Sequence, residues 1–272
     1  MDIRINGIIS DNDNTGLYTL FGYENFCPKM LDDAVQKLPA DDNELNLLIS
    51  SPGGSAFAGF DIYSAIKNLQ AKGLKVKATV TSLAASAAST IMAACEPALV
   101  SPVAQVMIHQ PMCFTDGNVE DHKDSIEFLN SVEEGIINGY VAKAKGKTSR
   151  ETFKKLVDKS TWMSAGEAVR LGLADGILGE ENFSAGSVMN SVSDIFGAVM
   201  NGLEVPTPAE LKARYEAMNA QQAAAEDETA DVPSAAAVTD LADEDGNGQE
   251  AEDDSWKLQA QHDLESKRFG NV

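Results

Sequence analysis

The chain has 272 residues, of which 43% are hydrophobic, so it is long enough for one sizeable globular domain with an appendage. Its formal net charge of −21 argues against nucleic acid and anionic membrane surfaces as partners, because both repel an acidic protein. The cysteines Cys27, Cys95 and Cys113 are odd in number and widely spaced, which indicates neither a disulfide framework nor a zinc site.

The N-terminal half alternates between strand and helix patterns. "IRINGII" (3–9) predicts a first strand, and "MDIRINGIIS" has no apolar segment typical of a signal peptide, which favours a cytoplasmic protein. "LNLLIS" (45–50) is a short apolar run that stops at "SPGG", as a buried strand does. Residues 56–73 predict a helix with one buried face and Gly73 near its C-terminal cap.

Residues 74–80 alternate like a strand, and "SLAASAASTIMAA" (82–94) predicts a helix of very small residues. Residues 78–95 carry no charge and are about as long as the shortest membrane span. Six of them are Ser or Thr, however, and most of the others are Ala, which is too weakly apolar for insertion. We therefore expect a buried strand followed by a buried helix.

The remaining elements indicate an α/β domain. Short strands are expected at 97–100 and 105–109, and amphipathic helices at 119–146 and 149–159. A further helix begins at a capping box of Ser164 and Glu167 and ends at Gly172, before a short strand at "DGIL". Strands that alternate with crossover helices predict a largely parallel sheet.

The composition changes after about residue 200. Residues 201–272 hold 17 Asp or Glu against 5 Lys or Arg. We expect a folded α/β domain over 1–182, a linker over 183–206 and an acidic tail over 207–272 that is largely disordered, because the tail cannot bury enough apolar surface to offset its ordering entropy. Short helices are predicted at 207–224 and 255–269, and the tail is a candidate assembly segment or a plain solubilising linker.

Three short motifs carry chemistry. Ser86 lies at a predicted strand-to-helix turn, where free N–H groups and the helix dipole favour a developing oxyanion. On this stretch alone, however, a packed Ala/Ser helix with a silent serine is the favoured explanation. The glycines of "SPGG" offer N–H groups without a side chain in the way. His109 ends a short strand, where it is either a general base or a structural histidine.

Taken together, "SPGG", "SLAASAAS", "MIHQP" and "TWMSAGEAVRLGLADGIL" resemble the ClpP family of serine peptidases, most closely its phage branch of head maturation (prohead) proteases. The resemblance covers roughly residues 1–180. It implies the crotonase-like ClpP fold, a parallel sheet with crossover helices, a Ser-His-Asp mechanism, and stacked rings that enclose the active sites. By position, it implies that Ser86 is the nucleophile, that His109 is the general base, and that the N–H groups of Gly54 and Ala87 form the oxyanion hole.

The resemblance also implies that Ser55 and Ala56, as strand-like residues, pair with an extended peptide substrate. The family's acid falls at Ser160 in this chain, and Asp158 lies two residues earlier. We expect Asp158 to take the role if the loop bulges; the alternative is that Ser160 or a backbone carbonyl orients the imidazole. Cys113 is expected to be a small buried residue and not a partner of His109.

The sequence thus predicts a serine endopeptidase that cleaves capsid or scaffold protein during head maturation, as a homo-oligomeric ring in the host cytoplasm or the assembling prohead. Neither a metal nor a cofactor is expected. In the family that the chain resembles, subunits that dock on an ATPase usually have an extra segment before the first strand. Here the first strand begins almost at once, which argues against an ATPase partner. The alternatives are a crotonase-like acyl-CoA enzyme and a non-catalytic, scaffold-like assembly protein.

Overall fold

The computed structural model describes residues 1–39, 42–180 and 206–230. Within these residues the chain forms two compact units. The larger unit contains residues 1–15 and 23–180, and the smaller unit contains residues 16–22 and 206–230. The remaining parts of the predicted linker (183–205) and tail (231–272) lie outside the described residues, and so does the helix predicted at 255–269.

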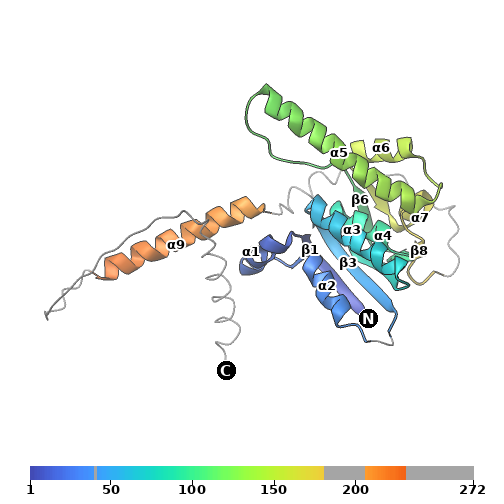
Figure 1. Cartoon of the computed structure of the whole chain (residues 1–272), viewed down its shortest axis with the longest axis horizontal. Helices are drawn as coiled ribbons and strands as arrows, with labels where there is room; N and C mark the ends of the chain where they lie inside the picture. The colour runs from blue at the N-terminus through green and yellow to red at the C-terminus, as the bar shows by residue number, and fades with distance from the viewer. Residues whose placement is uncertain (40–41, 181–205, 231–272) are drawn as a thin grey trace. The chain divides into compact units, whose positions relative to one another are not determined.

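The larger unit is an α/β domain (Figure 1). Its strands are β1 (Asp2–Ile9), β2 (Asn25–Phe26), β3 (Glu44–Gly54), β4 (Lys75–Ala85), β5 (Ala98–Val100), β6 (Gln105–Ile108), β7 (Thr161–Ser164) and β8 (Gly176–Ile177). Its helices are the 3-10 turn η1 (Asn12–Asn14), α2 (Pro28–Gln36), α3 (Ala56–Ala71), α4 (Ala87–Ala94), α5 (Val119–Ala144), α6 (Arg150–Asp158) and α7 (Ala165–Leu171).

One sheet joins all of these strands. Its main order is β2-β1-β3-β4-β5-β8, and β6 pairs with the end of β4 and with β7. Within the described residues, every pairing is parallel except that of β6 with β7. The predicted α/β fold with a largely parallel sheet is therefore confirmed.

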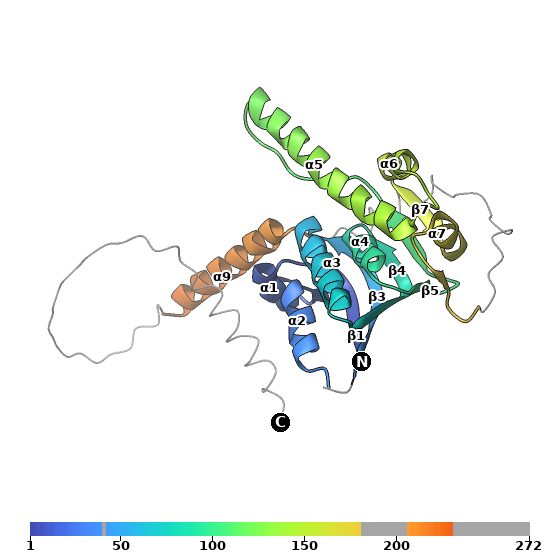
Figure 2. The same cartoon turned by 45° about the vertical axis from the view of Figure 1, so that its right-hand side comes forward.

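Helices cover one face of the sheet. α2, α3, α4 and α5 pack in that order (Figures 1 and 2). β3 alternates between fully buried residues such as Leu45, Leu47 and Ile49 and half-buried ones, because only one of its faces meets these helices. The N-terminal half of α5 extends beyond the helix layer in both views, whereas its C-terminal half is packed against the core.

Two strands are longer than the sequence predicts. β3 continues from Ser50 through the "SPGG" motif to Gly54, and β4 continues to Ala85, through residues expected to be helical. The extension of β4 is paired on both sides, with Ser51 of β3 and with Met107 of β6. These pairings outweigh the helix propensity of alanine, which amounts to only about 0.5 kcal/mol per residue.

Several helix ends follow the predicted capping signals. Ser164 and Glu167 form a capping box, and Gly172 closes α7 with a φ of 82°. The helices predicted at 56–73, 119–146 and 149–159 are all present, each shorter by a few residues. The sequence interpretation missed α2, β2 and β7, of which the two strands are too short to show a period.

The smaller unit contains α9 (Pro208–Ala230) and, from Gly16 onward, α1 (Thr15–Leu20). Thr207 and Glu210 cap α9 as predicted. The helix runs six residues past the predicted end at 224. The uncharged stretch 78–95 is divided between β4 and α4, and none of the helices in the described ranges is long and apolar enough to cross a membrane.

Candidate active site

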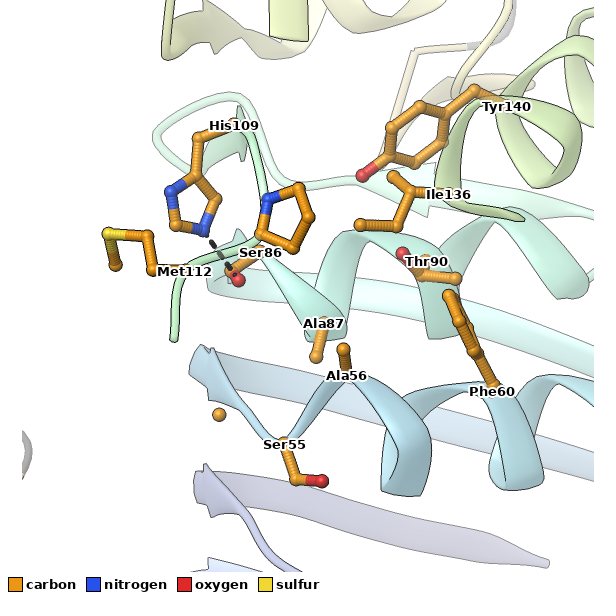
Figure 3. Close-up of a pocket in the computed structure, with 12 residues that line it drawn as sticks. Ser55, Ala56, Phe60, Ser86, Ala87, Thr90, His109, Met112, Ile136 and Tyr140 are labelled. Carbon is orange, nitrogen blue, oxygen red and sulfur yellow. Dashed lines mark hydrogen bonds between the residues drawn. The ribbon is translucent and has the colours of Figure 1, made fainter. Parts of the chain in front are cut away.

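Two strand ends bring Ser86 and His109 together. The last residues of β4 pair in parallel with β6, so that Ala85 lies beside Met107. Ser86 follows β4 directly and His109 follows β6 directly. His109 Nε2 lies 2.7 Å from Ser86 Oγ (Figure 3). This is a hydrogen-bond distance, so the serine proton can pass to the imidazole without a bridging water.

Ser86 occupies the strand-to-helix turn that the sequence predicts. It is the N-cap of α4, with φ 54° and ψ −126°, and its N–H donates to Met107 O at 2.9 Å. A positive φ is uncommon for a residue with a side chain and is found where the surrounding structure holds it in place. The turn exposes the serine Oγ at the end of the sheet, beside the N-terminus of α4.

Both glycines of "SPGG" are required by close backbone contacts. A Cβ atom on Gly53 (φ 94°) would lie 2.6 Å from Ser86 Cβ and 3.0 Å from Ala87 N. A Cβ atom on Gly54 (φ 151°) would lie 2.2 Å from Ile9 O. The sequence interpretation singled out Gly54, but Gly53 is the glycine that packs directly against the serine turn.

Small residues around Ser86 let α3 and α4 approach each other. A Cβ atom on Gly59 of α3 would lie 3.1 Å from Ala87 Cβ of α4, and Ala84, Ala85 and Ala88 are fully buried. A larger side chain at any of these positions would push α4, and Ser86 with it, away from the glycine turn. The run of small residues is therefore a packing requirement of the turn itself.

The imidazole of His109 is largely buried, and this burial lowers its pKa below the value of 6.5 for a free side chain. Desolvation has this direction because it disfavours the charged imidazolium. Within the described residues, the hydrogen bond to Ser86 is the one that the His109 side chain makes. At neutral pH the ring is therefore uncharged and able to accept the serine proton.

The predicted acid lies close by but is engaged elsewhere. Asp158 ends α6, and its Oδ1 accepts a hydrogen bond from Gln110 Nε2 at 3.0 Å and forms an ion pair with Lys154. Gln110 Nε2 also donates to Glu133 Oε2 at 2.9 Å, and Lys154 Nζ lies 2.9 Å from Glu133 Oε1. The side chain of Glu133 is only 5% exposed. In the described part of the chain, this network holds the residue after His109 but does not include the imidazole.

Ser160, at the family's acid position, precedes β7 with a φ of 51°. The antiparallel register pairs Ile108 with Thr161, so one further step along the two chains sets position 160 opposite His109. The sequence interpretation treated this alignment as a departure from the family. The pairing ends at Thr161, and Ser160 precedes it with a positive φ, next to the end of the strand that leads to His109.

The backbone of Ser55 is extended as predicted, with φ −60° and ψ 122°, whereas the expectation is wrong for Ala56, which is already helical. Ser55 is the N-cap of α3, where its Oγ accepts a hydrogen bond from Ala58 N at 3.2 Å and donates one to Asp11 Oδ1 at 2.8 Å, and Ala56 begins the helix. The Ser55 N–H is also occupied, because it donates to Ile9 O at 2.8 Å. Ser55 and Ala56 both line the pocket beside Ser86, and their contact with substrate stays a prediction.

A pocket of about 200 Å³ opens beside Ser86 and His109. Its walls come from the turn and first residues of α3, from α4, from the segment after His109, and from α5. Figure 3 shows the lining side chains, which are mostly apolar: Ala56, Phe60, Ala87, Met112, Ile136 and Tyr140. The sequence interpretation missed the contribution of α5, because nothing in the pattern of a long amphipathic helix marks which turn meets the serine.

A cysteine and a metal ion are the other reactive centres that the sequence analysis weighed. Cys113 is exposed, so the expectation that it is buried is wrong, and His109 Nε2 contacts Ser86 instead. In the ranges that the structure describes, no group of three or more His, Cys, Asp or Glu residues is arranged to hold a metal ion. The geometry therefore concentrates the reactive groups at Ser86 and His109.

Comparison with known proteins gives a consistent result. Residues 30–181 match the family model described as Clp protease. A relative from Chlamydia muridarum, named ATP-dependent Clp protease proteolytic subunit 1, is 34% identical over 168 residues, which cover 58% of this chain and 85% of that protein. The ATP-dependent Clp protease proteolytic subunit of Porphyromonas gingivalis is 31% identical over 137 residues, or 50% of this chain and 60% of that protein.

The glycine contact gives a direct test of the turn. Gly53→Ala is expected to slow fluorophosphonate labelling of Ser86 by about 100-fold or more, the scale of a lost oxyanion donor, because the new methyl group displaces Ser86 and Ala87. The matched control is Gly73→Ala, since Gly73 has the same φ of 94° but open space around its Cβ position. Equal labelling rates in the two variants would contradict the contact.

The burial of His109 predicts the pH dependence of the same labelling reaction. The rate is expected to rise with pH as the imidazole loses its proton, with a midpoint below 6.5, because burial lowers the His109 pKa. The rate should then stay constant through neutral pH. A midpoint above 6.5 would contradict this environment and indicate a negative charge next to the ring in the active protein.

Proposed function

This chain belongs to the Clp protease family, and from that premise we propose that it is a serine endopeptidase with Ser86 as nucleophile and His109 as general base. The single observation that supports these roles best is the 2.7 Å contact between Ser86 Oγ and His109 Nε2 at the strained turn before α4. A serine hydroxyl is a weak nucleophile until a neighbouring base accepts its proton, and this contact supplies the base.

The proposed reaction has two steps. Ser86 Oγ attacks the peptide carbonyl carbon while its proton passes to His109 Nε2, and the carbonyl oxygen becomes an oxyanion beside the N–H groups of Ala87 and Gly54. His109 then gives the proton to the departing amine, which leaves an acyl ester on Ser86. Water attacks the ester with His109 again as base, which releases the second product and restores the serine.

The lowered pKa of His109 suits this role only in part. It keeps the base uncharged at neutral pH, but it also makes the imidazolium formed during attack less stable. In a complete triad a carboxylate offsets this cost and orients the ring. We propose that this function belongs to the segment 158–160, with position 160 opposite the imidazole and Asp158 as the alternative that the sequence predicts.

The pocket supports a proposal about substrate. Its volume of about 200 Å³ and its walls of Phe60, Met112 and Ile136 fit one apolar side chain beside the scissile bond.

Clp proteases form oligomeric rings and act on proteins, and we propose a homo-oligomeric ring for this chain as well. The extended half of α5 and the loop before it support this proposal, because they expose Met112, Phe114, Val119, Ile126 and Phe128.

We further propose that the substrates are capsid or scaffold proteins processed during head maturation, in the host cytoplasm or inside the prohead. This proposal depends on the resemblance of the four sequence motifs to the phage branch alone, since the relatives found by comparison are bacterial Clp proteolytic subunits. Cleavage of such a protein in reconstituted proheads by the wild type, and not by Ser86→Ala, separates this substrate class from general protein degradation.

The proposed nucleophile is tested by labelling the full chain with a fluorophosphonate, after sedimentation has established its oligomeric state, and locating the label by mass spectrometry. The label is expected on Ser86, to disappear in Ser86→Ala, and to form at least about 100-fold more slowly in His109→Ala, the scale of general-base catalysis. An assembled wild type that neither labels nor cleaves peptides would favour a non-catalytic assembly protein.

The orienting position is tested by adding a carboxylate. Ser160→Asp is expected to raise kcat by about 10-fold or more, a modest part of the ~10⁴-fold effect of a triad aspartate, and to move the acid limb of the pH profile upward. Asp tolerates the positive φ at this position. Ser160→Asn has the same shape without the charge and should show neither change.

Asp158→Asn completes this test, because an asparagine Oδ1 still accepts the hydrogen bond from Gln110. It is expected to change kcat by less than about 10-fold, far below the ~10⁴-fold loss expected for a triad aspartate. A loss near that larger value would assign the orienting role to Asp158.

A further inference from the structure

A chain of hydroxyl groups runs from α5 to the peptide bond that follows Ser86. Ser89 Oγ lies 2.6 Å from Ser86 O, and Tyr140 Oη lies 2.7 Å from Ser89 Oγ. Ser89 is fully buried and Tyr140 is 1% exposed. Ser89 is the last residue of the "SLAASAAS" motif, but the sequence interpretation gave no role to it or to Tyr140.

The direction of these hydrogen bonds follows from proton counting. The carbonyl of Ser86 only accepts, so Ser89 must use its single hydroxyl proton on that carbonyl. Tyr140 therefore donates its own proton to Ser89 Oγ, and its hydroxyl has Thr90 as a second hydrogen-bond partner. Burial raises the pKa of Tyr140, which keeps this proton in place across the working pH range. The chain is thus polarised toward the Ser86 carbonyl, and consecutive bonds of this kind strengthen one another.

The carbonyl at the end of the chain is geometrically linked to the oxyanion site. Ser86 C=O and Ala87 N–H are the two polar groups of one planar trans peptide, so they point in opposite directions and rotate together. Whatever holds the carbonyl toward Ser89 also holds the Ala87 N–H toward the opposite side. A Cβ atom on Gly53 would lie 3.0 Å from Ala87 N, so the backbone of Gly53 is also close to this peptide.

This restraint matters because the peptide follows a strained residue. Ser86 has a positive φ, and a residue with a side chain relaxes from that conformation unless its neighbours oppose the change. The ordinary helix contacts to this carbonyl are those of Ser89 N at 3.0 Å and Thr90 N at 3.4 Å. A serine that bonds back to the carbonyl three residues earlier is common in helices. The tyrosine from a different helix is the additional element, since it fixes the serine rotamer from outside α4.

We propose that Tyr140 and Ser89 are positioning residues that aim the Ala87 N–H at the oxyanion. The inference rests on the proposed function, because it assigns a task to groups that do not touch the substrate carbonyl. Tyr140 is also part of the pocket wall, so the test must separate an effect on substrate binding from an effect on the oxyanion.

The experiment compares Tyr140→Phe, Ser89→Ala and the double variant of the full chain. Each is measured with a leucine aminomethylcoumarin peptide for kcat and KM, with a leucine peptide boronate as a tetrahedral mimic, and with fluorophosphonate titration to count active sites. The matched control is Tyr63→Phe, which removes the hydroxyl of a half-buried tyrosine on α3 that is outside this chain of hydrogen bonds.

Each single variant is expected to lower kcat per titrated site by about 10-fold, less than the ~100-fold or greater loss of a whole oxyanion donor. Boronate affinity should fall by a similar factor, while KM stays within about 2-fold of the wild type. The double variant should be no worse than the worse single variant, because both changes break one chain. Tyr63→Phe should match the wild type.

An unchanged kcat per site together with unchanged boronate affinity would overturn the inference, even if thermal stability falls. A rise in KM alone would overturn it too, since Tyr140 would then act only as pocket wall. If Tyr140→Phe does not fold, Ser89→Ala decides by the same criteria. A wild type that neither labels at Ser86 nor hydrolyses the peptide would overturn the proposed function itself, whereas an active wild type with unaffected variants would overturn this inference alone.

Discussion

The structure of this site depends on how closely three backbone segments approach one another: the end of β3, the end of β4 and the first turn of α4. Gly53 lies against Ser86 and Ala87 at distances that exclude a Cβ atom, and Gly59 lies against Ala87 in the same way from α3. Ser86 has its positive φ at this contact, and the first turn of α4 follows it directly. The glycines and alanines are there because any larger residue would separate these segments.

The second requirement is the short strand β6, which carries His109 to the same point. β6 pairs with the extension of β4 on one side and with β7 on the other, so it is held along both edges. The network of Gln110, Glu133, Lys154 and Asp158 fixes the residue after His109 to α5 and α6. A buried glutamate is costly unless it is paired, and here both of its oxygens have polar neighbours. The backbone around the imidazole is thus held firmly, although the ring itself has one hydrogen bond in the described residues.

α5 connects these features. Its exposed N-terminal half carries apolar side chains, its middle contributes Glu133 to the network and Ile136 to the pocket, and Tyr140 reaches the hydroxyl chain under α4. Contacts along one rigid helix move together, so a displacement of α5 would change the pocket wall, the segment after His109 and the peptide of Ala87 at once.

The sequence alone determined the fold class, the serine turn, the histidine and the capped ends of several helices, because each of these depends on local patterns: periodicity, caps and short motifs. It did not determine where β4 ends, since strand pairing with β6 overrides the local preference of "SLAA" for a helix. Nor could it place Gly53 against Ser86, Gln110 against Glu133 and Asp158, or Tyr140 against Ser89, because these contacts join residues 23 to 51 positions apart or depend on how helices pack. Only the tertiary structure decided those contacts, since side-chain burial and backbone distance across elements are properties of packing that no local pattern carries.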